Sequence, residues 1–130
     1  MRPLDLADGL RLLHSSRGEG RFGHREHLRF GWALLAEAAD VEEAERVAAL
    51  TIRHAAEVAG SPTKYHYTMT LFWIRMLARV REDHEVSTLD EAIQVHPDLA
   101  DPHLPDRYWS NIGDEEARRR WVEPDLQPLP

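Results

Sequence analysis

The fold is decided by the stretch Y-T-M-T-L-F-W-I-R-M-L, residues 67–77 of a chain of 130 residues. Apolar and aromatic side chains occupy this stretch almost all round a helix, and only Arg75 carries a charge. A helix that is apolar on nearly every side belongs in the interior, enclosed by other elements. The stretch therefore predicts a central helix that runs from Lys64 to about Glu82.

The segments before the central stretch also carry helical signals. Their apolar spacing predicts three further helices, over residues 4–14, 24–39 and 41–59. Asp40 is the expected N-cap of the third, and Gly60 is its expected stop. The Gly-rich break at residues 15–23 is not a phosphate-binding loop, since it follows no strand and lacks the Lys-Ser/Thr ending, so nucleotide chemistry is disfavoured.

The segments after the central stretch change in character. Two capping-box patterns, Ser87 with Asp90 and Thr88 with Glu91, predict a short helix over residues 89–96. Beyond it, prolines interrupt the chain, and only short helices are expected, one after Asp101-Pro102 and one capped by Asp114. The final W-V-E-P-D-L-Q-P-L-P contains too many prolines for a helix, which predicts an extended tail laid across the body.

Together these patterns predict the all-α class. The expected architecture is a compact helical bundle with a proline-rich, irregular carboxyl-terminal arm packed on the body. We expect a single helical domain over residues 1–130, with the bundle in about 1–96 and the short helices and tail in about 97–130. A homodimer held by the arm is compatible with the sequence, and so is an arm that wraps its own chain.

Composition restricts the classes of function. The formal net charge is −7, which argues against nucleic acid as a partner because affinity for phosphates rests on clustered Lys and Arg. The chain has no cysteine, so thiolate metal sites and cysteine nucleophiles are excluded. The longest apolar run, Met69 to Ile74, is too short to span a bilayer, and no secretory signal is seen. The expectation is a soluble cytoplasmic protein with no membrane partner.

Three histidines are the candidate functional residues. His24 and His27 open one helical pattern and are about 60° apart around its axis, close to the apolar stripe. His66 lies at the entry of the central stretch and shares its stripe with Met69 and Trp73. All three are therefore expected to point inward. If the two helix ends meet, the imidazoles converge as in an open metal site, with iron, copper or zinc as the expected divalent ion.

Other side chains have weaker assignments. Tyr65 and Thr70 flank His66 and are the candidate catalytic groups, because their hydroxyls could orient an imidazole or a ligand. A carboxylate ligand stays unassigned: Glu37 and Glu57 qualify by residue type, but Glu37 lies on the opposite face of its helix. The i, i+3 histidine pair is also a weaker pattern than the His-Glu-x-x-His helix of zinc proteases, which the sequence lacks.

The segments F-G-H-R-E-H-L-R-F-G-W-A-L-L, K-Y-H-Y-T-M-T-L-F-W-I-R and W-V-E-P-D-L-Q-P-L-P resemble a family of small uncharacterised bacterial all-helical proteins. The resemblance runs from about Phe22 to the carboxyl terminus. It implies an autonomous helical domain, and no activity, cofactor or substrate.

Two hypotheses of function remain. The first is a small metal-dependent enzyme, for example a tailoring enzyme of specialised metabolism, in which His24, His27 and His66 hold the ion and leave positions open for a small-molecule substrate. The second is a metal-free helical module that binds a small molecule or a protein, or an acid/base isomerase or cyclase, with the histidines as hydrogen-bonding groups.

Overall fold

The computed structural model describes residues 2–17 and 22–130, and within them every regular element is a helix. The predicted all-α class is confirmed. The α-helices are α1 (Leu6–Ser16), α2 (His24–Glu37), α3 (Val41–Val58), α4 (Tyr67–His84), α5 (Leu89–Val95) and α6 (Glu115–Arg119); the 3₁₀ helices are η1 (Pro62–Lys64), η2 (Pro97–Ala100) and η3 (Leu104–Arg107). The part of the Gly-rich break at residues 18–21 lies outside the described residues.

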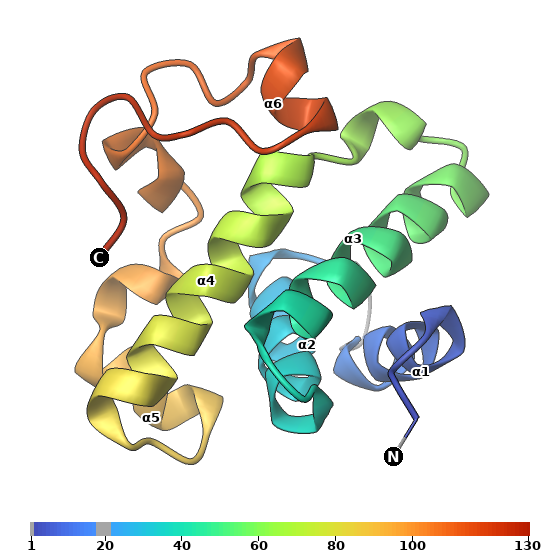
Figure 1. The fold of residues 1–130 in the computed structure, drawn as a ribbon, viewed down its shortest axis with the longest axis horizontal. Coiled ribbons are helices and arrows are strands. Elements are labelled where there is room, and N and C mark those ends of the chain that lie inside the picture. The colour runs from blue at the N-terminus through green and yellow to red at the C-terminus, as the bar shows by residue number, and fades with distance from the viewer. Residues whose placement is uncertain (1, 18–21) are drawn as a thin grey trace.

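The central helix of the fold is α4. It packs against α2 and α3 on one side and against α5 and the carboxyl-terminal segments on the other (Figure 1). Phe72 and Leu77 are completely buried, and Ile74 and Met76 are nearly so. Different elements cover the opposite sides of α4. This enclosure explains why the helix is apolar on almost every side.

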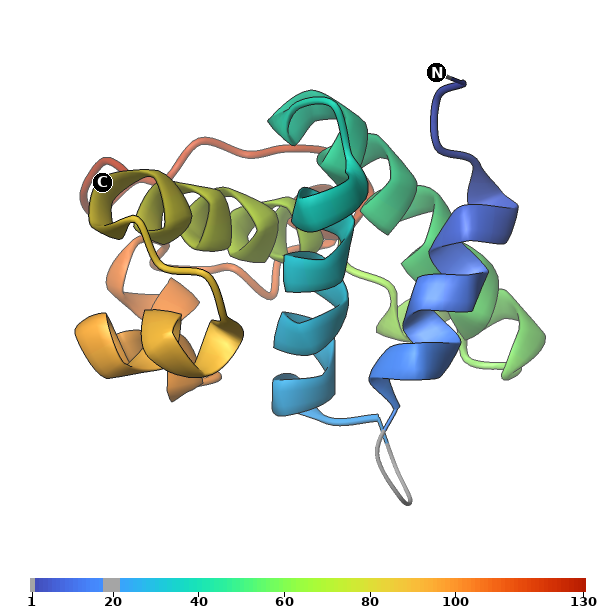
Figure 2. The ribbon, with the colours of Figure 1, turned by 90° about the horizontal axis from the view of Figure 1, so that it is seen from below.

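Two apolar clusters meet at α4. Phe72, Met76 and Leu77 belong to a cluster shared with α5 and the arm, whereas Ile74 joins a second cluster formed with α1, α2 and α3. Figure 2 shows α1 and α5 on opposite sides of α2. The contact between α1 and α3 is very close, since a Cβ atom added to Gly9 would lie 1.9 Å from Thr51 Oγ1.

Polar caps define the starts of the helices. Asp40 accepts the backbone N–H of Glu43, which confirms it as the N-cap of α3, and Gly60 follows that helix with a φ of 72°. In α1, Asp5 and Asp8 form a reciprocal capping box. Hydrogen bonds from Arg2 and from the backbone of Asp5 hold the pKa of the Asp8 carboxyl far below its usual range.

The start of α4 differs from the prediction. Lys64, the predicted first residue of the central helix, instead belongs to η1, which begins at Pro62. The helix α4 begins only at Tyr67. His66 is therefore not inside the helix: its backbone is extended (φ −138°, ψ 107°), and its imidazole caps the helix by accepting the backbone N–H of Met69. Histidine side chains seldom serve as N-caps, so the sequence pattern did not indicate this boundary.

The carboxyl-terminal arm packs on its own chain. Trp109 Nε1 donates to the carbonyl of Val122 at 2.9 Å, and Thr68 Oγ1 donates to the carbonyl of Arg120 at 2.7 Å. The backbone N–H of Val122 donates in turn to Thr68 Oγ1 at 3.2 Å. The arm thus covers the amino-terminal end of α4.

In the described part of the chain, we find no helix with the length and apolar character needed to cross a membrane.

Candidate functional site

The structure places His24, His27 and His66 in the wall of one pocket of about 360 Å³. The first two come from the start of α2, and His66 comes from the cap of α4. The rest of the wall is mostly apolar, with Phe22, Met69, Thr70, Trp73 and Pro102. We call this the histidine pocket. Its volume is near the lower end of the range for small-molecule sites, roughly 300–1,000 Å³.

Both ring nitrogens of His66 are engaged by the protein. Nδ1 accepts the backbone N–H of Met69 at 3.1 Å, and Nε2 faces the carbonyl of Ile112 at 2.5 Å. A carbonyl only accepts, so Nε2 carries the proton and the ring is the neutral Nε2–H tautomer. Burial lowers the pKa of His66, the hydrogen bond to Ile112 offsets part of this shift, and the positive charge of Arg118 adds to it. His66 therefore forms a structural part of the pocket wall.

His24 has one nitrogen engaged. Its Nε2 lies 2.8 Å from the carbonyl of Leu99, to which it donates, and its ring packs on Trp73 with centroids 4.5 Å apart. Nδ1 makes no hydrogen bond to another described residue. In this tautomer Nδ1 is an acceptor, so His24 offers one lone pair to a ligand.

His27 offers the most hydrogen-bonding capacity. Neither of its nitrogens bonds to a residue within 2–17 or 22–130, and its ring packs edge-on against Phe22 with centroids 4.4 Å apart. Desolvation and then the neighbouring His24 lower the pKa of His27. The residue is nonetheless exposed, so the expectation that all three histidines point inward is wrong for His27. Solvent limits the size of the pKa shift, and its downward direction favours the neutral ring at neutral pH. A neutral imidazole both donates and accepts.

The two candidate catalytic hydroxyls are placed differently. Thr70 lines the histidine pocket, where its Oγ1 donates to the carbonyl of His66 at 2.7 Å and keeps only acceptor capacity for a ligand. Tyr65 does not line this pocket. Burial raises the pKa of Tyr65 to about 12, so its hydroxyl stays protonated. The position of Tyr65 thus gives no support to a role for it at the histidines.

The donors are not arranged as a metal site. Within residues 2–17 and 22–130, no three His, Asp or Glu side chains are grouped so that they could hold an ion. His66 would have to release the backbone of α4 to bind one. The candidate carboxylates are also engaged, Glu37 with Arg11 at 2.9 Å and Glu57 with Arg53 at 3.2 Å. The three-histidine metal site stays a prediction from the sequence.

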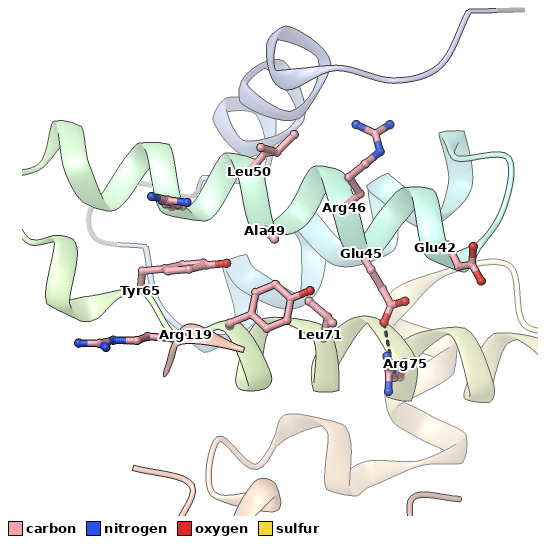
Figure 3. Close-up of a pocket in the computed structure, with 11 residues that line it drawn as sticks. Glu42, Glu45, Arg46, Ala49, Leu50, Tyr65, Leu71, Arg75 and Arg119 are labelled. Atoms are coloured by element: carbon pink, nitrogen blue, oxygen red, sulfur yellow. Dashed lines mark hydrogen bonds and ion pairs between the residues drawn. The ribbon is translucent and has the colours of Figure 1, made fainter. Parts of the chain in front are cut away.

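A larger groove of about 600 Å³ lies between α3 and α4 (Figure 3). Tyr65 points its hydroxyl into this groove, and Glu45 pairs across it with Arg75 at 2.6 Å. The guanidinium of Arg75 also stacks 3.9 Å from the centroid of Trp121. The charges of Glu45 and Arg75 in this groove are therefore matched to each other.

Sequence reasoning did not find Phe22 and Pro102 as pocket residues. Phe22 precedes α2, and Pro102 comes from a loop that no periodic pattern places. Trp73 was accessible to prediction because it shares the inward side of the central helix with Met69. No family model, curated protein or solved structure gives a significant match to this chain, and the resemblance stated from the sequence stays an expectation.

Proposed function

We propose that the protein is a metal-free helical module that binds a small, largely apolar molecule in the histidine pocket. The observation that carries this proposal is the combination of an apolar wall with unused imidazole nitrogens on His24 and His27. Ligand pockets typically combine an apolar lining with a few placed polar groups.

The polar groups indicate the class of ligand. His27 is a neutral donor and acceptor, and His24 Nδ1 is an acceptor. The part of its lining that the structure describes includes no Lys or Arg, and so it favours an uncharged ligand. Trp73 and Phe22 favour a planar ring. A neutral aromatic molecule with one hydroxyl group fits these requirements best.

The lowered pKa of His27 argues for binding over proton transfer. A general base is most effective when its pKa lies near the working pH, and burial and His24 move the pKa of His27 away from that range. The ring is suited to hydrogen bonding, where neutrality is an advantage. An acid/base isomerase or cyclase is therefore the less favoured form of this proposal.

The test is titration with 2-naphthol, and with naphthalene as the comparator that lacks the hydroxyl. We expect 2-naphthol to shift the imidazole signals of His27 and the indole signal of Trp73 in NMR spectra. His27→Phe keeps an aromatic ring but removes the hydrogen bond, and it should weaken binding about tenfold, equivalent to one hydrogen bond. His84→Gln, an exposed histidine outside the pocket, is the matched control. Equal affinity for both probes would count against the proposal.

A metal-dependent enzyme is the second candidate, and the presence of three histidines on one pocket wall favours it. Its test is elemental analysis after incubation with Zn²⁺, Cu²⁺ or Fe²⁺. One equivalent bound by the unmodified chain and lost in His27→Phe would support this candidate over the metal-free module. Uptake that is unchanged in His27→Phe and in His66→Asn would exclude the pocket as the metal site.

A further inference from the structure

A basic surface lies between η1 and α6, and none of the residues that line it lines the histidine pocket. Here Lys64, Arg118, Arg119 and the single carboxylate of Glu115 line a groove of about 670 Å³. We call it the basic groove. It gathers three cationic side chains in a chain whose formal net charge is −7. Figure 1 shows α6 beside the amino-terminal end of α4, which places this groove at the same end of the central helix as His66.

The charge pattern of α6 leaves Arg118 without an acidic partner. Three acids at 114–116 precede three arginines at 118–120, and two of the i, i+4 pairs form: Glu115 with Arg119 and Glu116 with Arg120. Asp114 instead caps the helix by accepting the backbone N–H of Glu116. Arg118 forms no ion pair with any residue that the structure describes. The i, i+4 ion pairs of α6 therefore do not account for Arg118.

The guanidinium of Arg118 is held in place while most of its donors stay free. It is half-buried, and its Nη1 donates to the carbonyl of Thr63 at 2.7 Å. This bond uses one of five N–H donors. A guanidinium that is already positioned loses less side-chain freedom when it binds an anion. Lys64 likewise forms no ion pair among the described residues.

The surroundings leave room for a ligand. A Cβ atom added to Gly113, which lines the groove, would meet nothing within 4 Å. Arg119 lines both this groove and the α3–α4 groove (Figure 3), and its pair with Glu115 is exposed, with side chains about three-quarters accessible. Exposed pairs of this kind contribute little free energy, so Arg119 can exchange its partner for a bound anion.

We propose that the basic groove binds the phosphate group of a small molecule. A phosphate dianion matches one positioned guanidinium flanked by two further cations, because Arg binds phosphate oxygens through paired N–H donors and Lys adds a point charge. The groove is a second site, and it does not depend on what the histidine pocket binds.

Occupancy of the basic groove has a consequence at His66. His66 bonds the carbonyl of Ile112, whose neighbour Gly113 lines the basic groove. After burial, the positive charge of Arg118 contributes to the lowering of the pKa of His66. A phosphate on Arg118 offsets the positive charge, and so it raises the pKa of His66 towards its ordinary value. The other titratable groups that share the pocket with His66 are His24 and His27, which do not line the basic groove.

The test is NMR titration of the full chain with inorganic phosphate and with glycerol 3-phosphate, against chloride at matched ionic strength. We expect saturable shifts at Arg118 and Gly113 with both phosphates, and a rise in the pKa of His66. Tighter binding of glycerol 3-phosphate identifies a phosphate ester as the ligand, and equal binding identifies free phosphate. Acetate should bind more weakly than either, and equal affinity for acetate would overturn the assignment to phosphate.

Variants distinguish a specific phosphate site in the basic groove from nonspecific attraction of anions to positive charge. Arg118→Gln should weaken phosphate binding about tenfold or more and remove the response of His66, and Lys64→Gln should weaken binding without loss of the Thr63 contact. Arg79→Gln, an exposed arginine of α4 paired with Asp83, is the matched control. Phosphate affinity that is the same in Arg118→Gln, Lys64→Gln and the unmodified chain would overturn the proposal.

Discussion

At the scale of single residues, His66 links three parts of the molecule. Its ring caps α4 through Met69, bonds the carbonyl of Ile112 and forms part of the wall of the histidine pocket. These bonds require one tautomer of the neutral ring. Protonation would add a hydrogen to Nδ1 and so remove the acceptor that caps the helix.

Substitutions at His66 separate these roles. His66→Ala removes the cap, worth about 1 kcal/mol, and leaves the buried carbonyl of Ile112 without its donor, which costs about 1–3 kcal/mol. Asparagine is a good N-cap but too short to reach Ile112, so His66→Asn should recover about the cap contribution of 1 kcal/mol. Urea denaturation measures both. Equal losses of unfolding free energy in the two variants would show that the cap contributes nothing.

At the scale of elements, the contact between α1 and α3 depends on the absence of a side chain at Gly9. An added Cβ would overlap Thr51 Oγ1 and approach Val47 Cγ1 at 3.0 Å. Thr51 is fully buried and its hydroxyl bonds the carbonyl of Val47, so it has little freedom to move away. The two helices are therefore held at the distance that glycine permits.

Gly9→Ala should destabilise the protein although alanine favours a helix. Overpacking costs about 1–3 kcal/mol, offset by up to about 1 kcal/mol of helix propensity. Gly113→Ala is the control, since its Cβ meets open space, and it should change stability by less than about 0.5 kcal/mol. Thermal unfolding of both variants is the measurement. Adding Thr51→Ala to Gly9→Ala should restore part of the loss, and no restoration would place the strain elsewhere.

The helices could be predicted from the sequence more closely than the hydrogen bonds of individual side chains. Helical periodicity, with caps such as Asp40 and Thr88, is a local signal, so α3 and α5 could be predicted closely. The nearness of the histidines could also be anticipated from their places at two helix entries. The bonds of His24 to Leu99 and of His66 to Ile112 could not, because they join segments 75 and 46 residues apart that no local pattern relates.

At the scale of the whole molecule, the histidine pocket makes stability sensitive to mild acid. The native pKa values of His27 and His66 are both lowered, whereas the unfolded chain has histidine pKa values of about 6.5. Below that value the unfolded chain binds more protons than the native protein, so the unfolding free energy falls as the pH falls. The stabilisation is fully present above about pH 7.

Urea denaturation between about pH 7.5 and about pH 5 tests this dependence. The double variant His27→Phe with His66→Asn should show a flatter profile of unfolding free energy over this window. Asp8 affects stability at lower pH. Its native pKa is also depressed, so its contribution to the unfolding free energy is lost only as the carboxylate is protonated in strong acid. An unchanged slope in the double variant would show that other groups govern the response to mild acid.

The closure of the arm over α4 also has a kinetic consequence. The bonds from Thr68 to Arg120 and Val122 join residues 52 and 54 positions apart. Closing such long loops costs chain entropy before any contact is gained, whereas the helices of the bundle form from neighbouring residues. The helix pairs should consequently assemble first, and the arm should lock onto them in the last step of folding.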